Sequence, residues 1–423
     1  FRRRTCLPAP ARPHTVPLVM SDDMVEAIDS FTSLYAATVV EYLRGVFDPM
    51  IANAASLLTD TVPRDRSTVY IFGSGGAHAI ARQMARSLRE RFAGVCGVRV
   101  SSGVDFHESQ STALRAGYRS VFEGVLESER ADGRDLVVLL SGGGDAEGVL
   151  RAARHCRARG IPTISIAGMD GGRITREGLT DHPIVVGIHD HQMSEDVMQI
   201  LGHVLVETAY RDHVEGGASL ERCLDEHTSR IERALARVDA VVLDRVSSRV
   251  GAAFLSDRAV FLLAPEGGAL GIAAEHAAHV LNWDTVLQLR RPPRRMVHST
   301  PTACDYSGIA NDRMMPGVVT CQQLDRALPG DVLLLYAADL RSEPARNTLR
   351  AASAAGVEVM ALAGHASIPP AVHAIVFGSV DPDILADVGQ VTAHILGRLI
   401  RLKIERAAGD LAQWRSIDLV AGM

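Results

Sequence analysis

Lysine is almost absent from this chain of 423 residues. Of its 44 basic residues only Lys403 is a lysine, and the others are arginines. A nucleotide-binding loop of the Walker A type needs a lysine directly after its glycines, so that class of protein is excluded. Catalysis through a lysine Schiff base, including pyridoxal phosphate chemistry, is disfavoured for the same reason. Apolar runs that approach the ~20 residues of a membrane span are also missing, so we expect no membrane partner.

The chain also lacks an excess of positive charge and paired cysteine motifs. Its net charge is −6, so the sequence predicts no nucleic acid partner. The six cysteines show neither a CxxC pair nor zinc-finger spacing, which indicates free thiols in a reducing compartment. We therefore expect a cytoplasmic protein.

The first 20 residues differ in composition from the rest. They carry four arginines and four prolines, no acidic residue and no apolar run of signal-peptide length. We expect a disordered tail over residues 1–20, ahead of a start near Met20 or Met24. The alternative is an organellar transit peptide.

The two halves of the chain repeat each other. Residues 68–88 and 259–280 both read as an apolar run, a glycine-containing turn and a helical pattern. The apolar runs 134–141 and 330–337 match as well, and so do two late helices that carry His203 and His394. These blocks recur in the same order at offsets of about 190 to 200 residues, which indicates a tandem duplication.

Each half alternates short apolar runs with helical patterns. This alternation is typical of a parallel sheet with helices on both faces. We therefore predict an α/β protein of two doubly wound units, residues 21–211 and 220–423, joined by a linker at 212–219. Amphipathic helices are expected at about 31–58 and 219–250, and terminal helices at about 194–210 and 384–408.

Two glycine-rich turns in the first half follow predicted strands. They are Gly73–Gly76 (GSGG) and Ser141–Gly144 (SGGG). Ligands of open parallel sheets lie at the carboxyl ends of the strands, and the N–H groups of such turns can bind an anion. The alternative is a tight strand-to-helix connection, with Asp145 as a helix N-cap.

This order of strand, G-S-G-G turn, helix, strand and serine-containing turn resembles the sugar isomerase (SIS) domain, once in each half. The A-G-x-D-G-G segment at Ala167–Gly172 and the E-x7-H spacing of Glu195 and His203 add to the resemblance. Within the SIS family the likeness is to phosphoheptose (sedoheptulose 7-phosphate) isomerases. The resemblance implies a sugar phosphate substrate. It also implies zinc or another divalent metal, held by an H-x3-E pair on the first helix and by Gln and His on the last.

The chain departs from this family pattern in both halves. The H-x3-E positions hold Gln83 and Ser87 in the first half, and Glu275 and His279, in reversed order, in the second half. Residues four apart lie on one helical face, so Glu275 and His279 form a metal-competent pair. The predicted metal ligands are Glu275, His279, His394 and Gln390. The predicted catalytic residues are Glu275, His279, His394 and His203.

These histidines also fit structural roles. His276 and His279 lie on an alanine-rich helix, where packing or surface histidines are common. His203 and His394 fit helix-buried histidines that bond to the backbone.

Because the first half keeps the glycine-rich turns and the second half keeps metal-competent side chains, we predict one site composed from both halves. The segment Ala310–Asp312 resembles the family's Gly-Asn-Asp segment near the substrate. The predicted substrate-binding residues are Gly73, Ser74, Gly75, Gly76, Ser141, Gly142, Gly143, Asn311, Asp312 and Ser342. The resemblance also implies a homodimer that copies a four-domain assembly.

The sequence thus predicts a phosphosugar isomerase of the aldose–ketose type, similar to sedoheptulose 7-phosphate isomerase. Such a reaction needs a base and a group that polarises a carbonyl. The alternative is a non-catalytic phosphosugar-binding regulator or scaffold, because Ser141 is the hydroxyl that remains in the first-half phosphate turn. Lyase or transfer chemistry on the same fold stays open. So does a likeness to family relatives that bind a replication initiator and catalyse nothing.

Overall fold

The computed structural model describes residues 22–46, 49–103, 106–286, 297–298, 318–365, 368–369 and 372–407. The predictions for the tail 1–20 and for Asn311 and Asp312 lie outside these residues. Among the described helices, none combines the length and the apolarity that crossing a bilayer requires.

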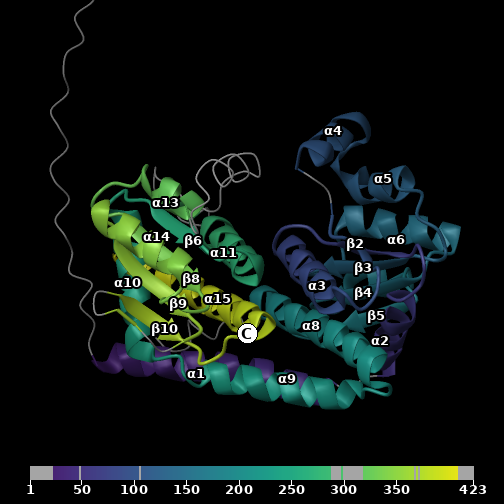
Figure 1. Cartoon of the computed structure of the whole chain (residues 1–423), viewed down its shortest axis with the longest axis horizontal. Helices are drawn as coiled ribbons and strands as arrows, with labels where there is room; N and C mark the ends of the chain where they lie inside the picture. The colour runs from purple at the N-terminus through teal and green to yellow at the C-terminus, as the bar shows by residue number, and fades with distance from the viewer. Residues whose placement is uncertain are drawn as a thin grey trace, which may run out of the picture.

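Two five-stranded sheets form the centres of the two halves (Figure 1). In spatial order, the first sheet contains β2 (Arg99–Ser101), β1 (Thr68–Phe72), β3 (Leu136–Ser141), β4 (Thr163–Ala167) and β5 (His182–Val185). The second contains β7 (Val297–His298), β6 (Val260–Leu263), β8 (Val332–Ala337), β9 (Glu358–Ala363) and β10 (His373–Val376). Every strand pair is parallel, and the strand order is the same in both sheets. The predicted fold of two doubly wound α/β units is confirmed.

Helices connect and cover the strands. The first half contains α1 (Asp22–Gly45), α2 (Pro49–Thr61), α3 (Gly76–Phe92), α4 (Phe106–Ala116), α5 (Val121–Ser128), α6 (Glu147–Arg159), α7 (Gly172–Arg176) and α8 (His191–Glu215). The second contains α9 (Leu220–Leu235), α10 (Ala240–Leu255), α11 (Gly268–Val280), α13 (Val318–Leu324), α14 (Glu343–Ala354) and α15 (Pro382–Ala407). A π-helical turn, η2 (Leu281–Val286), follows α11.

The halves share one hydrophobic core. Alternate residues of a strand point to opposite faces of its sheet. Val69 and Ile71 of β1 therefore face a core that also contains Val260 and Leu262 of β6. This common core is filled by α3 and α8 from the first half and by α11 and α15 from the second, which pack against each other across the interface (Figure 1). The outer faces of the two sheets have separate, smaller cores.

The two halves also exchange their first helices. Helix α1 packs against α9 and α10 of the second half, whereas α9 packs against α8 of the first half (Figure 1). Each exchanged helix stays tied to its own half by a buried polar contact, since the Tyr35 hydroxyl on α1 donates to Asp196 on α8 at 2.7 Å. His227 on α9 lies 2.7 Å from Asp387 on α15.

Three predicted boundaries need correction. The helix predicted at about 31–58 is two helices, α1 and α2, because Pro49 stands at the start of α2 and proline favours the first turn of a new helix. The helix predicted at 219–250 is likewise α9 and α10, because the Asp239 side chain caps α10 by accepting from the Val241 N–H at 2.7 Å. The predicted linker 212–219 is shorter, because α8 continues to Glu215.

The single lysine ties α15 to α10 within the second half. The Lys403 ammonium on α15 donates to the Asp244 carboxylate at 2.7 Å and to the hydroxyls of Ser247 and Ser248 on α10. Burial lowers its pKa, and Asp244 opposes this shift. A compact ammonium suits this set of acceptors better than a planar guanidinium.

We expect Lys403→Met to lower the free energy of unfolding by about 2–4 kcal/mol, because it leaves a carboxylate and two hydroxyls without their cation. Urea denaturation measures the change. Arg401→Met on the same helix is the matched control, since Arg401 forms an exposed pair with Glu405 and should shift stability by less than about 0.5 kcal/mol. Equal effects in the two variants would contradict the prediction.

Candidate active site at the interface of the two halves

A buried polar cluster on the inner side of the first sheet surrounds Glu195. This residue lies in the first turns of α8, where the Asp190 side chain caps the helix by accepting from the Met193 N–H at 2.9 Å. The Glu195 side chain is 6% exposed. Three imidazole nitrogens lie within 4 Å of its carboxylate: His191 at 3.4 Å, His276 at 3.6 Å and His394 at 3.7 Å. His276 comes from α11 and His394 from α15, so both halves contribute.

The charge of Glu195 is strongly stabilised. Burial alone raises the pKa of a carboxyl group. Here the contact with His276 and the charges of His394 and His191 outweigh burial and bring the Glu195 pKa down to about 2. Glu195 is therefore an anion throughout the physiological range. This suits it to hold a cation and disfavours it as the group that carries a proton.

A buried carboxylate orients His394. The His394 Nδ1 lies 2.8 Å from Asp196, which also accepts from the Gln390 amide at 3.1 Å and from the Tyr35 hydroxyl. Burial lowers the pKa of His394, but Asp196 and Glu195 outweigh it and the net shift is upward. With Nδ1 bonded to Asp196, Nε2 is directed at Glu195. A carboxylate behind a histidine in this way is typical of metal-binding histidines.

Glu195, His276 and His394 are arranged as a metal-binding set. One ligand atom from each lies within 4.8 Å of the other two, and all three residues are buried. Both ring nitrogens of His276 and Nε2 of His394 are buried without a hydrogen-bond partner. Orphaned buried polar atoms are rare and indicate a missing partner. Two imidazoles and one carboxylate are a donor set that suits Zn²⁺ with one coordination position open. The residues present therefore fit a divalent cation.

The two glycine-rich turns of the first half reach this cluster. A Cβ on Gly76, the first residue of α3, would lie 2.4 Å from a Glu195 carboxylate oxygen. A Cβ on Gly142, after β3, would lie 2.1 Å from the His191 ring. A side chain at either position would displace Glu195 or His191. Glycine is required at Gly73 and Gly144 of the same turns, where a Cβ would lie 2.4 Å from the Ala77 carbonyl oxygen and 2.0 Å from that of Gly171. The Ser141 hydroxyl accepts from the Gly144 N–H at 3.0 Å and so shapes its own turn. We call the two turns together with Glu195, His276 and His394 the composite site.

Two predicted metal ligands lie beside this cluster, outside the metal-binding set. The Glu275 carboxylate pairs with Arg82 of α3 at 2.5 Å and is 46% exposed. His279 lies near Gly75, and its ring is nearly parallel to that of Trp283, with centroids 6.3 Å apart. The Gln390 amide donates to Asp196, which in turn contacts His394, so Gln390 is not in the set itself. Of the predicted ligands, His394 belongs to the set.

Glu195 and His276 are the residues that the sequence interpretation did not select as metal ligands. The E-x7-H spacing singles out Glu195, and the alanine-rich helix favours a packing or surface role for His276. A signal that could have found Glu195 is its place before Asp196, since Asp196 aligns with Asp387 in the second half while Ala386 stands where Glu195 does. No comparable signal separated His276 from His279.

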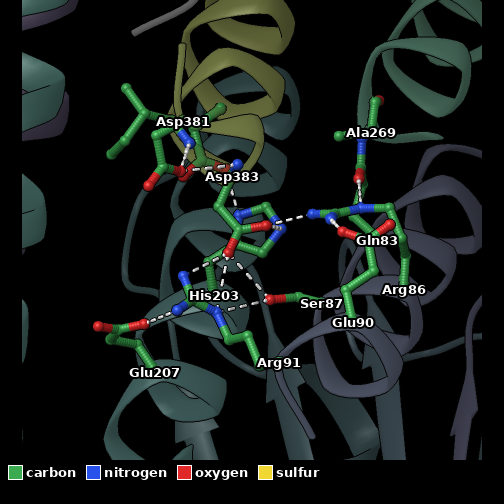
Figure 2. A network of polar contacts seen from close by, with 12 residues as sticks. Gln83, Arg86, Ser87, Glu90, Arg91, His203, Glu207, Ala269, Asp381 and Asp383 are labelled. Atoms are coloured by element: carbon green, nitrogen blue, oxygen red, sulfur yellow. Dashed lines mark hydrogen bonds and ion pairs between the residues drawn. The ribbon is translucent and has the colours of Figure 1, made fainter. Parts of the chain in front are cut away.

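His203 lies in a second cluster, which is formed by side chains of α3, α8 and α15 (Figure 2). Its Nδ1 is 2.8 Å from Asp387, and its Nε2 is 3.6 Å from Asp383. Asp383 in turn pairs with Arg86 and with Arg91 of α3. Burial raises the Asp383 pKa, but His203 and the two guanidinium groups outweigh it, so the net shift is downward. We call Arg86, Arg91, His203 and Asp383 the counterpart cluster.

Ser342, a predicted substrate ligand, is engaged by other groups. Its hydroxyl caps α14 by accepting from the Ala345 N–H, and it donates to Glu266 at 2.5 Å.

Comparisons with known proteins agree with this architecture. A SIS domain matches residues 35–168. The phosphoheptose isomerase of Chlorobium limicola is 30% identical over 189 residues, which are 43% of this chain and 85% of that protein. The phosphoheptose isomerase of Nitratiruptor sp. is 29% identical over 153 residues, 36% of this chain and 80% of that protein.

Two solved structures span both halves. The C-terminal domain of glucosamine-fructose-6-phosphate aminotransferase from Francisella tularensis has a TM-score of 0.56 at 12% identity and covers 91% of this chain and 98% of its own. Glucosamine-6-phosphate deaminase from Thermotoga maritima has a TM-score of 0.51 at 13% identity and covers 89% of this chain and 95% of its own. At these identities the likeness concerns the fold alone.

The molecule is thus a two-unit α/β protein whose candidate site lies between its units. The chain belongs to the SIS domain family, and its relatives there include phosphoheptose isomerases.

Proposed function

We propose that this protein is a phosphosugar isomerase of the aldose–ketose type, acting at the composite site on a substrate similar to sedoheptulose 7-phosphate. The observation that carries the proposal is the buried set of Glu195, His276 and His394 beside two turns that require glycine. The relationship to phosphoheptose isomerases supports the same class of substrate. The expected homodimer and the cytoplasmic location stay predictions.

The residues of the composite site would have different roles: holding a metal, orienting a metal ligand, binding the phosphate and contacting the sugar. Glu195, His276 and His394 would hold a divalent cation such as zinc, which would supply a Lewis acid to polarise the substrate carbonyl. Asp196 and Tyr35 keep the His394 ring in one orientation. The turn Ser141–Gly144 would receive the phosphate through its N–H groups. His191, whose side chain is 55% exposed, lies on the solvent side of Glu195, where a bound sugar would contact it.

The test combines metal analysis with a screen of aldose and ketose phosphates. Isomerisation through an enediol exchanges a carbon-bound hydrogen next to the carbonyl with solvent, so incubation in D₂O should place deuterium in the substrate, as read by NMR. We expect stoichiometric metal, interconversion and exchange with at least one seven- or six-carbon sugar phosphate. Binding without exchange would favour the non-catalytic sugar-phosphate-binding alternative, and no binding would overturn the proposal.

The turn after β3 can be tested separately. A Cβ on Gly143 would meet no protein atom within 4 Å, so Gly143→Val should fold normally while its side chain covers the N–H groups of the turn. We expect sugar phosphate to bind at least ~10-fold more weakly, or about 1.4 kcal/mol, by calorimetric titration. Gly97→Val is the matched control, because Gly97 is equally unobstructed but precedes β2 at the opposite end of the sheet. Unchanged affinity in Gly143→Val would place the phosphate elsewhere.

A further inference from the structure

The duplication creates a second location that is equivalent to the composite site. Gly268 begins α11 as Gly76 begins α3, each after a glycine of positive φ. His203 and His394 hold equivalent positions on α8 and α15, each with Nδ1 on an aspartate of the other half. The equivalence therefore holds for the histidine, its aspartate and the glycine-led helix.

The metal-binding residues are not repeated there. In the paired helices α3 and α11, Met84 stands where His276 does. In α8 and α15, Ala386 stands where Glu195 does. Of the three residues of the composite set, the second location keeps the histidine, His203. His203, His227 and Asp387 do place one ligand atom each within 4.8 Å of one another there. Both Asp387 oxygens, however, are already bonded to these two histidines, at 2.8 Å and 2.7 Å.

Positive charge at the second location comes from arginine. The Arg91 guanidinium bridges two carboxylates, donating to Asp383 at 2.7 Å and pairing with Glu207. Arg86 pairs with the other oxygen of Asp383, and the Ser87 hydroxyl donates to Asp383 at 2.9 Å (Figure 2). A guanidinium is always charged, and its planar set of N–H donors can bind two carboxylates at once. The carboxylate that faces His203 is thus neutralised by the chain itself.

Negative charge at the second location also comes from the chain. One oxygen of Glu266 accepts from the Ala338 N–H at 2.8 Å, and the other accepts from the Ser342 hydroxyl. Ala338 follows β8 as Gly142 follows β3, so this N–H is the equivalent of one in the predicted phosphate turn. Ser74 holds the position of Glu266 in the first half. A carboxylate accepting from an N–H and a hydroxyl occupies the groups that would otherwise bind a phosphate.

We propose that the chain has one reaction site and that its equivalent is an anion-binding turn filled by the chain's own Glu266, with Arg86 and Arg91 in place of a metal. This inference rests on the proposed function for the identity of the open site. It predicts one metal ion and one anion per chain. It also predicts that a second anion site for phosphate appears once Glu266 is removed.

The test titrates inorganic phosphate into the full-length chain and its variants by calorimetry. We expect one phosphate per chain in the parent protein and two in Glu266→Ser, which restores the first-half residue. Glu266→Ser combined with Gly143→Val should return the count to one. Glu343→Ser, an equal change of charge in the first turn of α14, is the control and should add no site.

The outcomes separate the two proposals. Two phosphates in the parent protein, or no gain in a folded Glu266→Ser variant, would overturn the single-site inference. No phosphate in the parent protein with one in Glu266→Ser would support the filled turn while removing the phosphate turn of the composite site. Metal analysis by mass spectrometry is the second readout: two metal ions per chain, or a metal that survives in His394→Ala, would also overturn the inference.

Discussion

Replacing His394 by alanine should remove the metal from the composite site and lower turnover by at least ~10²-fold. His394 supplies one of three buried donor groups, and its Nε2 has no other hydrogen-bond partner. Without it, Glu195 and His276 give two donors, fewer than the three protein ligands of a catalytic zinc site. The measurements are metal content after dialysis and the rate of sugar phosphate interconversion.

The matched control is His203→Ala, which removes an equally buried imidazole from the counterpart cluster. Both variants lose a hydrogen bond to a buried aspartate, so we expect similar losses of thermal stability. Metal content should fall in His394→Ala alone. Retention of the metal in a folded His394→Ala variant would show that His394 is a packing residue and would remove the metal-assisted mechanism.

Much of the fold could be predicted because both halves show the same order of apolar runs and glycine-containing turns. The glycine-containing turns and the apolar runs fixed the number of units, and a matched order of blocks implies a matched order of strands. The exchange of α1 and α9 could not be predicted. Both helices are amphipathic, and an apolar stripe does not show which half it covers. Tyr35 and His227, whose buried contacts hold α1 to α8 and α9 to α15, are ordinary helix residues in the sequence.

The residues of the candidate metal-binding set could not be chosen from spacing alone. Spacing selected Glu275 and His279 as a pair on one helical face, but spacing does not show which face is turned inward. Helix α11 is alanine-rich, so its pattern leaves several faces apolar enough to be buried. Its packing against α3 and α15 places His276 inside and brings Glu275 to Arg82. The face of α11 that is buried is therefore determined by the contact between the two halves.

Replacing Asp387 by asparagine should lower the free energy of unfolding by about 3–5 kcal/mol, the usual effect of removing one partner from a buried charged network. Asp387 accepts from the Gln199 amide at 3.0 Å, and its two oxygens lie 2.8 and 2.7 Å from His203 and His227. These contacts join α8, α9 and α15 across the interface, so their loss weakens the packing of the two halves. Urea denaturation at fixed pH measures the effect.

The stabilising contributions of Asp387 and His203 depend on pH in opposite directions. Burial raises the Asp387 pKa, but His203 and His227 outweigh it, so the folded pKa is below its ordinary value. Its stabilising effect is therefore lost as pH falls below about 4. Burial lowers the His203 pKa, but Asp387 and Asp383 outweigh it and the net shift is upward. The contribution of His203 is present below about pH 6.5 and is lost as pH rises through its folded pKa.

The stability difference between the parent protein and Asp387→Asn should thus be largest between about pH 4 and 6.5, where both groups are charged. Glu405→Gln on the same helix is the control, because its exposed pair with Arg401 should contribute less than about 0.5 kcal/mol at any pH in this range. A difference that does not change between pH 4 and 9 would mean that Asp387 stabilises the interface through uncharged hydrogen bonds. A loss of stability no larger than that of Glu405→Gln would show that Asp387 does not stabilise the interface.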